Sequence, residues 1–282
     1  MKKIVIIGGG AAGYFTAINA KESNPNIEVT ILEKGKDVLQ KVKISGGGRC
    51  NVTHACFEPK ELVKFYPRGE KELLGPFHQF MTGDTFEWFD DRGVPLKIEG
   101  DNRVFPEANT SQAIIDCFQK AVDTLGIKVL TNHGVNSVTK KDDTWSIHTK
   151  EQIFEADQLV IAAGSSKKVW ELCETLDHLV IAPVPSLFTF NINDKRLVDL
   201  LGTSVPNATV TISGTKLEAS GPLLITHWGM SGPAVLKLSA FGARILADKN
   251  YQYNVEVNWL SRPTDKVLNV LLNLKKKEPR KT

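Results

Sequence analysis

Three glycines near the N-terminus have a spacing that could bind a phosphate group. Gly8-x-Gly10-x-x-Gly13 follows the β-branched run 4–7 and precedes an alanine-containing stretch with helical character. In such a pattern Gly8 permits a tight turn, Gly10 lets a pyrophosphate approach the backbone, and Gly13 lets the helix pack on the strand. Because the first N–H groups of a helix are free to bind anions, the segment predicts a dinucleotide-binding turn.

Glu33 lies 20 residues past Gly13, at the end of a second apolar run, residues 27–32. A carboxylate at this place can accept hydrogen bonds from a ribose diol, and its charge would repel a 2′-phosphate. Glu33 therefore favours FAD or NAD over NADP. The alternative is a glycine-rich turn without a ligand. Four glycines within six residues make that alternative less attractive, because each costs about 0.5–1 kcal/mol in regular structure.

A second glycine-rich stretch runs from Ser45 to Asn51, with the sequence Ser-Gly-Gly-Gly-Arg-Cys-Asn. Its backbone N–H groups could surround an anion or a planar ring. Arg49 could pair with a phosphate in bidentate fashion. A neighbouring cation lowers a thiol pKa, so Cys50 could be reactive, although packing or contact with a cofactor is the favoured role. A mobile surface loop is the alternative.

His227 and Trp228 precede Ser231, a predicted helix cap, and could face a substrate carbonyl or anion. A buried, hydrogen-bonded histidine beside a core tryptophan is the favoured reading. The chain has no H-E-x-x-H, no C-x-x-C pair and no nucleophile elbow. Metal and acyl-transfer chemistry therefore lack support.

The first half of the chain predicts the elements that would hold these residues. Residues 4–7 and 27–32 with the helix between them form a βαβ unit, which implies a parallel pair. The run 158–163 is similar and is placed in the same sheet. Further predictions are a hairpin over 94–105, a helix over 110–125 capped by Thr110 or Ser111, and a three-stranded meander over 128–153.

After Pro183 the composition changes to short Thr/Val/Ile runs divided by glycine and proline, which suits a small β domain. A helix from Ser231 to about 247, a strand over 251–259 and a helix over 263–277 follow. The sequence therefore predicts a domain boundary near residue 184.

Composition and charge limit the function classes. With 41% apolar and 24% charged residues, the 282-residue chain is an ordinary globular protein. Residues 275–282 carry five bases and one acid, a net +4, so the rest is near −1 given the total of +3. We therefore expect a small-molecule substrate and no nucleic-acid or membrane partner. Four scattered cysteines and the lack of a long apolar run favour a cytoplasmic protein. The oligomeric state is not specified.

Four segments resemble the BaiN-like (YhiN-like) family of bacterial flavoproteins, which are NAD(P)/FAD-dependent oxidoreductases. They occur in family order and are residues 44–53, Asn102–Pro106, Leu159–Gly164 and Thr226–Leu236. The resemblance implies an α/β fold with three parts. They are a Rossmann-like FAD/NAD(P)-binding domain over 1–184, an inserted β-barrel-like, β-rich domain with one helix over 185–260, and the start of a helical subdomain over 261–282. The family pattern continues past residue 282, so the chain is expected to be C-terminally shortened.

The resemblance also implies how FAD would bind. Its ADP half would lie on the first glycine turn, the Ser45–Asn51 loop would approach the flavin, and Gly134-Val135 would hold the adenine through the backbone. The residues expected to contact FAD are Gly8, Gly10, Ala11, Ala12, Gly13, Glu33, Lys34, Ser45, Gly46, Gly47, Gly48, Arg49, Cys50, Asn51, Val135, Ala163 and Gly164.

The expected function is a flavin-dependent oxidoreductase. It would pass hydride from a reduced nicotinamide, NAD(P)H, through FAD to an organic acceptor such as an activated C=C bond. No catalytic acid or base and no metal ligand is identified. The alternatives are an NAD-dependent dehydrogenase, a non-catalytic flavoprotein remnant and a flavoprotein that modifies RNA, the last disfavoured by the charge balance.

Overall fold

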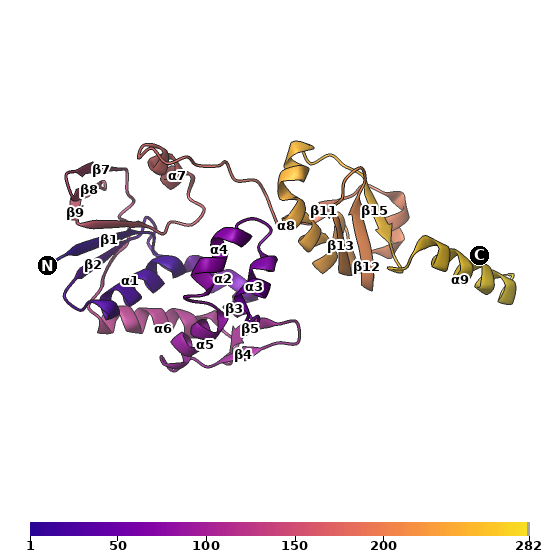
Figure 1. The fold of residues 1–282 in the computed structure, drawn as a ribbon, viewed down its shortest axis with the longest axis horizontal. Helices are drawn as coiled ribbons and strands as arrows, with labels where there is room; N and C mark the ends of the chain where they lie inside the picture. The colour runs from indigo at the N-terminus through magenta and orange to yellow at the C-terminus, as the bar shows by residue number, and fades with distance from the viewer. Residues whose placement is uncertain (281–282) are drawn as a thin grey trace. The chain divides into compact units, whose positions relative to one another are not determined.

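A computed structural model describes residues 1–280 and divides the chain into two compact units (Figure 1). The first unit is Met1–Val180 and the second is Ile181–Thr282. The division lies a few residues before the change in composition at Pro183. Residues 281–282, the end of the basic tail, lie outside the described residues.

A four-stranded parallel sheet organises the first unit. Its order is β10 (Gln158–Ile161), β1 (Lys3–Ile7), β2 (Glu28–Leu32) and β6 (Lys128–Leu130). Helix α1 (Ala11–Ser23) connects β1 to β2. The predicted βαβ unit and the placement of the 158–163 run beside it are confirmed. Because the strands are parallel, their carboxyl ends meet at one edge, where ligands of open α/β sheets bind.

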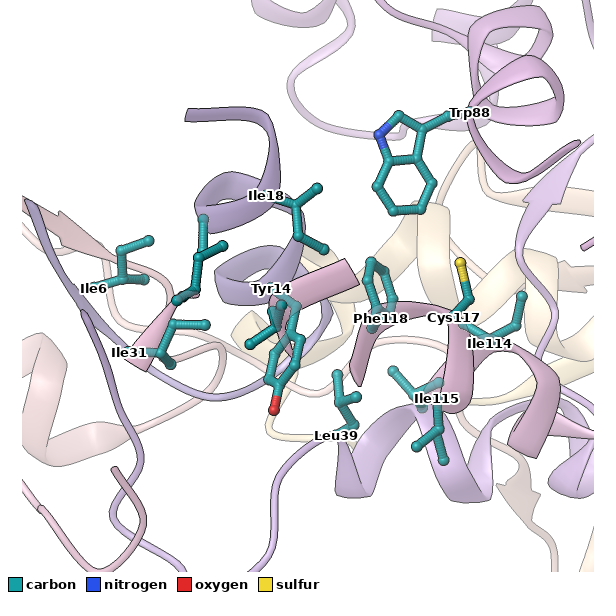
Figure 2. Close-up of a cluster of buried hydrophobic side chains, with 14 of the residues drawn as sticks. Ile6, Tyr14, Ile18, Ile31, Leu39, Trp88, Ile114, Ile115, Cys117 and Phe118 are labelled. Atoms are coloured by element: carbon teal, nitrogen blue, oxygen red, sulfur yellow. The ribbon is translucent and has the colours of Figure 1, made fainter. Parts of the chain in front are cut away.

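The main core of this unit lies around α1 and α6 (Ser111–Thr124), as Figure 2 shows. Ile18 of α1 and Ile31 of β2 are completely buried. The ring of Phe118 on α6 lies 5.9 Å from Tyr14 and 5.6 Å from Trp88, measured between centroids. At the start of α6 the Thr110 hydroxyl accepts a hydrogen bond from the Gln112 N–H, so Thr110 is the predicted cap.

Smaller elements complete the first unit. A three-stranded antiparallel sheet, in the order β3-β5-β4, contains the predicted hairpin. Residues 34–39 are irregular, and a helix, α2, begins at Gln40. The remaining bounds are α2 (Gln40–Gly48), β3 (Thr53–His54), α3 (Pro59–Leu62), a 3₁₀ turn (Val63–Phe65), α4 (Glu70–Phe77), α5 (Thr82–Asp90), β4 (Leu96–Ile98), β5 (Arg103–Pro106) and α7 (Lys167–Glu174).

The meander predicted over 128–153 is wrong at its start. Residues 128–130 are β6 of the parallel sheet, and the antiparallel meander consists of β7 (Ser137–Lys141), β8 (Thr144–His148) and β9 (Ile153–Ala156). Helix α6 returns the chain to the sheet beside β2, which makes the next strand parallel. A run of three residues is too short for its hydrophobic pattern to indicate this pairing.

The second unit is a five-stranded antiparallel sheet with a helix packed on it. The order is β11 (Phe190–Asn191), β14 (Gly229–Ser231), β13 (Glu218–Thr226), β12 (Ser204–Ile212) and β15 (Val255–Asn258). Helix α8 (Pro233–Asp248) buries Val235 and Leu238 against this sheet. A 3₁₀ turn (Lys195–Leu200) and α9 (Thr264–Lys277) complete the unit.

The predicted cap of α8 is wrong by one residue. Ser231 ends β14, and Gly232 is the N-cap with a φ of 96°. A Cβ on residue 232 would lie 2.8 Å from the Pro222 carbonyl oxygen. The close approach of β13 therefore requires glycine at this junction, and Pro233 opens the helix as expected.

None of the helices within residues 1–280 is long and apolar enough to cross a membrane.

Candidate dinucleotide site

The turn between β1 and α1 shows two close backbone contacts that only glycine allows. Gly8 has a φ of 119°, and a Cβ there would lie 2.5 Å from the Ala162 carbonyl oxygen. A Cβ on Gly13 would overlap the carbonyl oxygen of Gly8. These two positions hold β1, α1 and the segment after β10 together, as the sequence predicted for Gly13.

Gly10 is different, because its missing side chain faces open space. No heavy atom lies within 4 Å of the position that a Cβ would take. Gly10 is the N-cap of α1, no side chain caps the helix, and Ala11 and Ala12 in the first turn are exposed. The N-terminal N–H groups of α1 therefore face a space where a pyrophosphate could lie against the backbone, so the turn fits a dinucleotide.

Glu33 is fixed at the carboxyl end of β2. Its Oε2 accepts a hydrogen bond from the Gly9 N–H at 2.8 Å, and its Oε1 accepts one from the Gly35 N–H at 2.7 Å. The carboxylate thus lies against the glycine turn. Since an ionised carboxylate can accept about four hydrogen bonds, it keeps acceptor sites for a ribose diol.

The segment after β6 lies beside the segment after β2. The His133 N–H donates to the Glu33 carbonyl oxygen at 2.8 Å. A Cβ on Gly134 would lie 3.3 Å from Cβ of Lys34. Val135 is buried in a core cluster, so only its backbone is available to a ligand. Lys34, which is expected to contact FAD, therefore lies beside residues 134–135, which the resemblance assigns to the adenine.

The loop from Ser45 to Asn51 interrupts α2 with left-handed backbone. Gly46, Gly47 and Gly48 have φ values of 56°, 69° and 84°. A Cβ on Gly46 would lie 2.7 Å from the Asn51 N atom, whereas Gly47 and Gly48 have open space around theirs. The Asn51 side-chain amide lies within hydrogen-bonding distance of the Val104 backbone on β5. The loop is therefore anchored at Gly46 and Asn51 and presents bare backbone between them.

Arg49 already has partners within the chain. Its Nη1 lies 2.6 Å from Oε1 of Glu99, and its guanidinium lies 3.9 Å above the Phe105 ring centroid. The hydrogen bond and charge of Arg49 lower the pKa of Glu99, so this carboxylate is ionised at neutral pH. The predicted pairing of Arg49 with a phosphate would require it to leave Glu99. In this structure Arg49 instead ties the glycine loop to the end of β4.

Cys50 does not have the features of a reactive thiol. It is buried, and burial raises its pKa above the usual value, opposed by a weaker effect of the hydrogen bond to Ser45. The thiol is therefore protonated at neutral pH, and packing is the better account of this residue. Thiolate chemistry at Cys50, the less favoured reading of the sequence, is not supported.

The favoured reading of His227 and Trp228 is wrong. Both side chains are exposed, Trp228 at 44%, and their ring centroids lie 4.1 Å apart. They form the two-residue turn between β13 and β14, at the end of the hairpin. Among residues 1–280, no group of three His, Cys, Asp or Glu side chains could hold a metal ion.

Sequence reasoning missed Lys41, in the first turn of α2. Its Nζ donates a hydrogen bond to Oγ of Ser165, which follows β10, at 2.7 Å. The contact joins residues 124 positions apart in the sequence. No local pattern indicates such a pairing, since a lone lysine early in a helix is ordinarily a solvated side chain.

Comparison with known protein families decides where the chain belongs. The model of the HI0933-like protein Rossmann domain matches residues 2–235, most of the chain. The chain belongs to the HI0933-like family. This membership confirms the resemblance to the BaiN-like flavoproteins and the Rossmann-like α/β fold class.

Curated relatives of this HI0933-like chain carry two kinds of name. A 3-dehydro-bile acid delta(4,6)-reductase of Clostridium scindens is 26% identical over 270 residues, which cover 92% of this chain and 65% of that protein. A ribosomal RNA dihydrouridine synthase of Haemophilus influenzae is 28% identical over 251 residues, covering 84% and 61%. The chain thus spans less than two thirds of the length of these relatives.

Two solved structures are similar to parts of the HI0933-like chain. Thermovibrio ammonificans THI4 has a TM-score of 0.42 at 12% identity, covering 62% of each chain. The bacillithiol disulfide reductase Bdr of Staphylococcus aureus has a TM-score of 0.33 at 24% identity, covering 58% of this chain and 39% of that one.

Proposed function

We propose that this HI0933-like chain binds FAD and takes part in a flavin-dependent reduction. Hydride would come from NAD(P)H and would go to a C=C bond activated by a neighbouring carbonyl. The observation that carries the proposal is the uncapped start of α1 facing the open side of Gly10, with the Glu33 carboxylate fixed beside it. Family membership supports the same cofactor.

The acceptor class rests on what the names of the relatives have in common. A delta(4,6)-reductase that acts on a 3-dehydro-bile acid reduces C=C bonds conjugated to a ketone. Dihydrouridine is uridine in which the C=C bond next to a ring carbonyl has been reduced. Both names therefore describe addition of hydride to a conjugated C=C bond, and we propose this reaction class for the present protein.

The chain's own residues would supply binding and orientation. The α1 N-terminus would hold the pyrophosphate and Glu33 the ribose, while the bare backbone of Gly47 and Gly48 would offer N–H donors toward the flavin. When bound, FAD supplies the flavin N5 that accepts and donates hydride. The ion pair of Arg49 with Glu99 would keep the glycine loop in place.

A spectrum of the purified chain tests the cofactor proposal. Flavin absorption near ~450 nm that survives desalting, or returns after FAD is added, is the expected result, because the ring is the chromophore. Loss of this absorption when NADH or NADPH is added in the absence of oxygen then identifies the reductant. A folded protein that stays colourless with added FAD would contradict the proposal. Assays with a conjugated steroid ketone would follow.

A second candidate acceptor is the uracil ring within RNA. Two curated relatives, from Haemophilus influenzae and Escherichia coli, are named ribosomal RNA dihydrouridine synthases. The near-neutral charge outside the C-terminal tail argues against strong binding to RNA. This candidate would be favoured if unmodified ribosomal RNA reoxidises the reduced flavin and small conjugated ketones do not.

Replacing Glu33 with alanine should weaken FAD binding by about 10- to 100-fold. This is the range for losing a charge-assisted hydrogen bond to the ribose, worth about 1.5–3 kcal/mol. FAD titration followed by flavin fluorescence measures the change. Glu33→Gln serves as the comparison, because it keeps an oxygen acceptor and should lose less. Equal affinities of wild type and a folded Glu33→Ala protein would rule out the ribose contact.

A further inference from the structure

Lys41 lies close to the glycine turn in the structure. Its position in the sequence does not indicate this. Two residues before it, the Leu39 N–H donates to the Gly9 carbonyl oxygen at 2.8 Å, so the start of α2 is attached to one side of the turn. On the other side, Gly8 packs against the Ala162 carbonyl group. The turn is therefore flanked by α2 and by the segment after β10.

The Lys41 side chain connects these two flanking segments. Its Nζ lies 2.7 Å from Oγ of Ser165 and 3.6 Å from the position that a Cβ on Gly164 would take. Gly164 has a left-handed φ of 57°. The ammonium group thus lies at the same sheet edge as the turn, where the carboxyl ends of β1 and β10 meet.

The charge of Lys41 has no acidic partner within the described part of the chain. Its hydrogen-bond partner is a neutral hydroxyl, and the carboxylate of the glycine turn, Glu33, accepts from the Gly9 and Gly35 N–H groups instead. An ammonium group has three donors, so two remain after the bond to Ser165. Lys41 therefore offers a positive charge and free donors at the sheet edge that also carries the uncapped start of α1.

We propose that Lys41 binds the pyrophosphate of FAD, opposite the N–H groups of α1. The inference rests on the proposed binding of FAD and adds a residue to it. The helix N-terminus supplies only partial positive charge, whereas a pyrophosphate carries about two negative charges that need a full countercharge. Ser165 would hold the ammonium group in position in the absence of the ligand.

Lys41→Gln tests the proposal with three probes of decreasing charge and size: FAD, ADP and adenosine. We expect binding of FAD and ADP to weaken about tenfold at low salt, as for a lost charge-assisted bond, with adenosine unchanged. The affinity of the variant should also depend less on salt, because one screened charge has been removed. Lys41→Arg should keep most of the affinity. Calorimetry gives the dissociation constants, and thermal unfolding of the ligand-free variants checks the fold.

Two controls separate a contact with phosphate from a structural role. Lys43→Gln changes an exposed lysine two positions along the same helix, and it should leave ADP affinity unchanged. Ser165→Ala removes the hydroxyl partner only. If Lys41 acted merely by joining α2 to Ser165, then Ser165→Ala would reproduce the loss and adenosine would weaken as much as ADP.

The outcomes also distinguish this inference from the proposed function. If the wild type binds FAD and Lys41→Gln binds it with the same affinity, the role of Lys41 is overturned and the cofactor proposal stands. Equal weakening of adenosine and ADP would also overturn the role of Lys41. A folded wild-type protein that binds neither FAD nor ADP would overturn both the cofactor and the role of Lys41.

Discussion

Replacing Gly10 with valine should abolish FAD binding, with a loss of at least about 100-fold, while the protein stays folded. The Cβ position of Gly10 has no neighbour within 4 Å, so the chain itself has room for the side chain. Gly10 has φ −92° and ψ −175°, an extended conformation that valine readily adopts. The only structural cost is that valine caps a helix less well than glycine, about 1 kcal/mol. The new methyl groups would fill the space where the pyrophosphate must contact the backbone.

Flavin fluorescence titration measures the loss, and thermal unfolding measures the fold. Gly83→Val is a matched control, because Gly83 lies in the first turn of α5 and also has open space around its Cβ position. We expect Gly83→Val to keep its FAD affinity, and Gly10→Ala to give a smaller loss than valine. A folded Gly10→Val protein with near-normal affinity would show that FAD binds elsewhere.

Replacing Gly13 with alanine should cause a large loss of stability, in contrast to Gly10→Val, which should lose FAD binding and stay folded. A Cβ at this position would overlap the carbonyl oxygen of Gly8, which is backbone and cannot rotate away. Helix α1 would have to move off β1, where Ile6 and Ala17 are completely buried. We expect a decrease in the free energy of unfolding at the upper end of the ~1–3 kcal/mol typical of overpacking, or more.

Urea denaturation of the ligand-free proteins measures this effect, with Gly10→Ala as the control. Both variants add one methyl group to the same turn, three residues apart. Alanine is a better helix former than glycine at residue 13, inside α1, but a poorer N-cap at residue 10, so the control itself costs about 1 kcal/mol. A Gly13→Ala protein as stable as Gly10→Ala would contradict the close packing of α1 on β1. Together the substitutions distinguish Gly10, which is expected to leave room for the ligand, from Gly13, which allows α1 to pack on β1.

The sequence alone determined the glycine turn between the first strand and the first helix. Gly8 and Gly13 make the expected close backbone contacts, and Glu33 follows the second strand, because backbone geometry is local and a fixed spacing imposes it. The continuous apolar run 158–163 likewise indicated a strand of the parallel sheet. The expected burial is wrong, because β10 lies at the edge of the sheet and Gln158 and Ile161 are exposed. The amphipathic helix over 110–125 followed from its periodic apolar face and its Thr110 cap.

Tertiary structure decided the features that depend on distant residues. The register of residues 128–130 was set by pairing with β2, and the exposure of Trp228 by the hairpin that carries it. Arg49 faces Glu99, 50 residues away, and Lys41 faces Ser165, 124 residues away. A charged side chain on a long flexible stem takes whichever partner the fold brings within hydrogen-bonding distance. The sequence specifies the type of the charged side chain, but its partner is determined only when the strands and helices pack together.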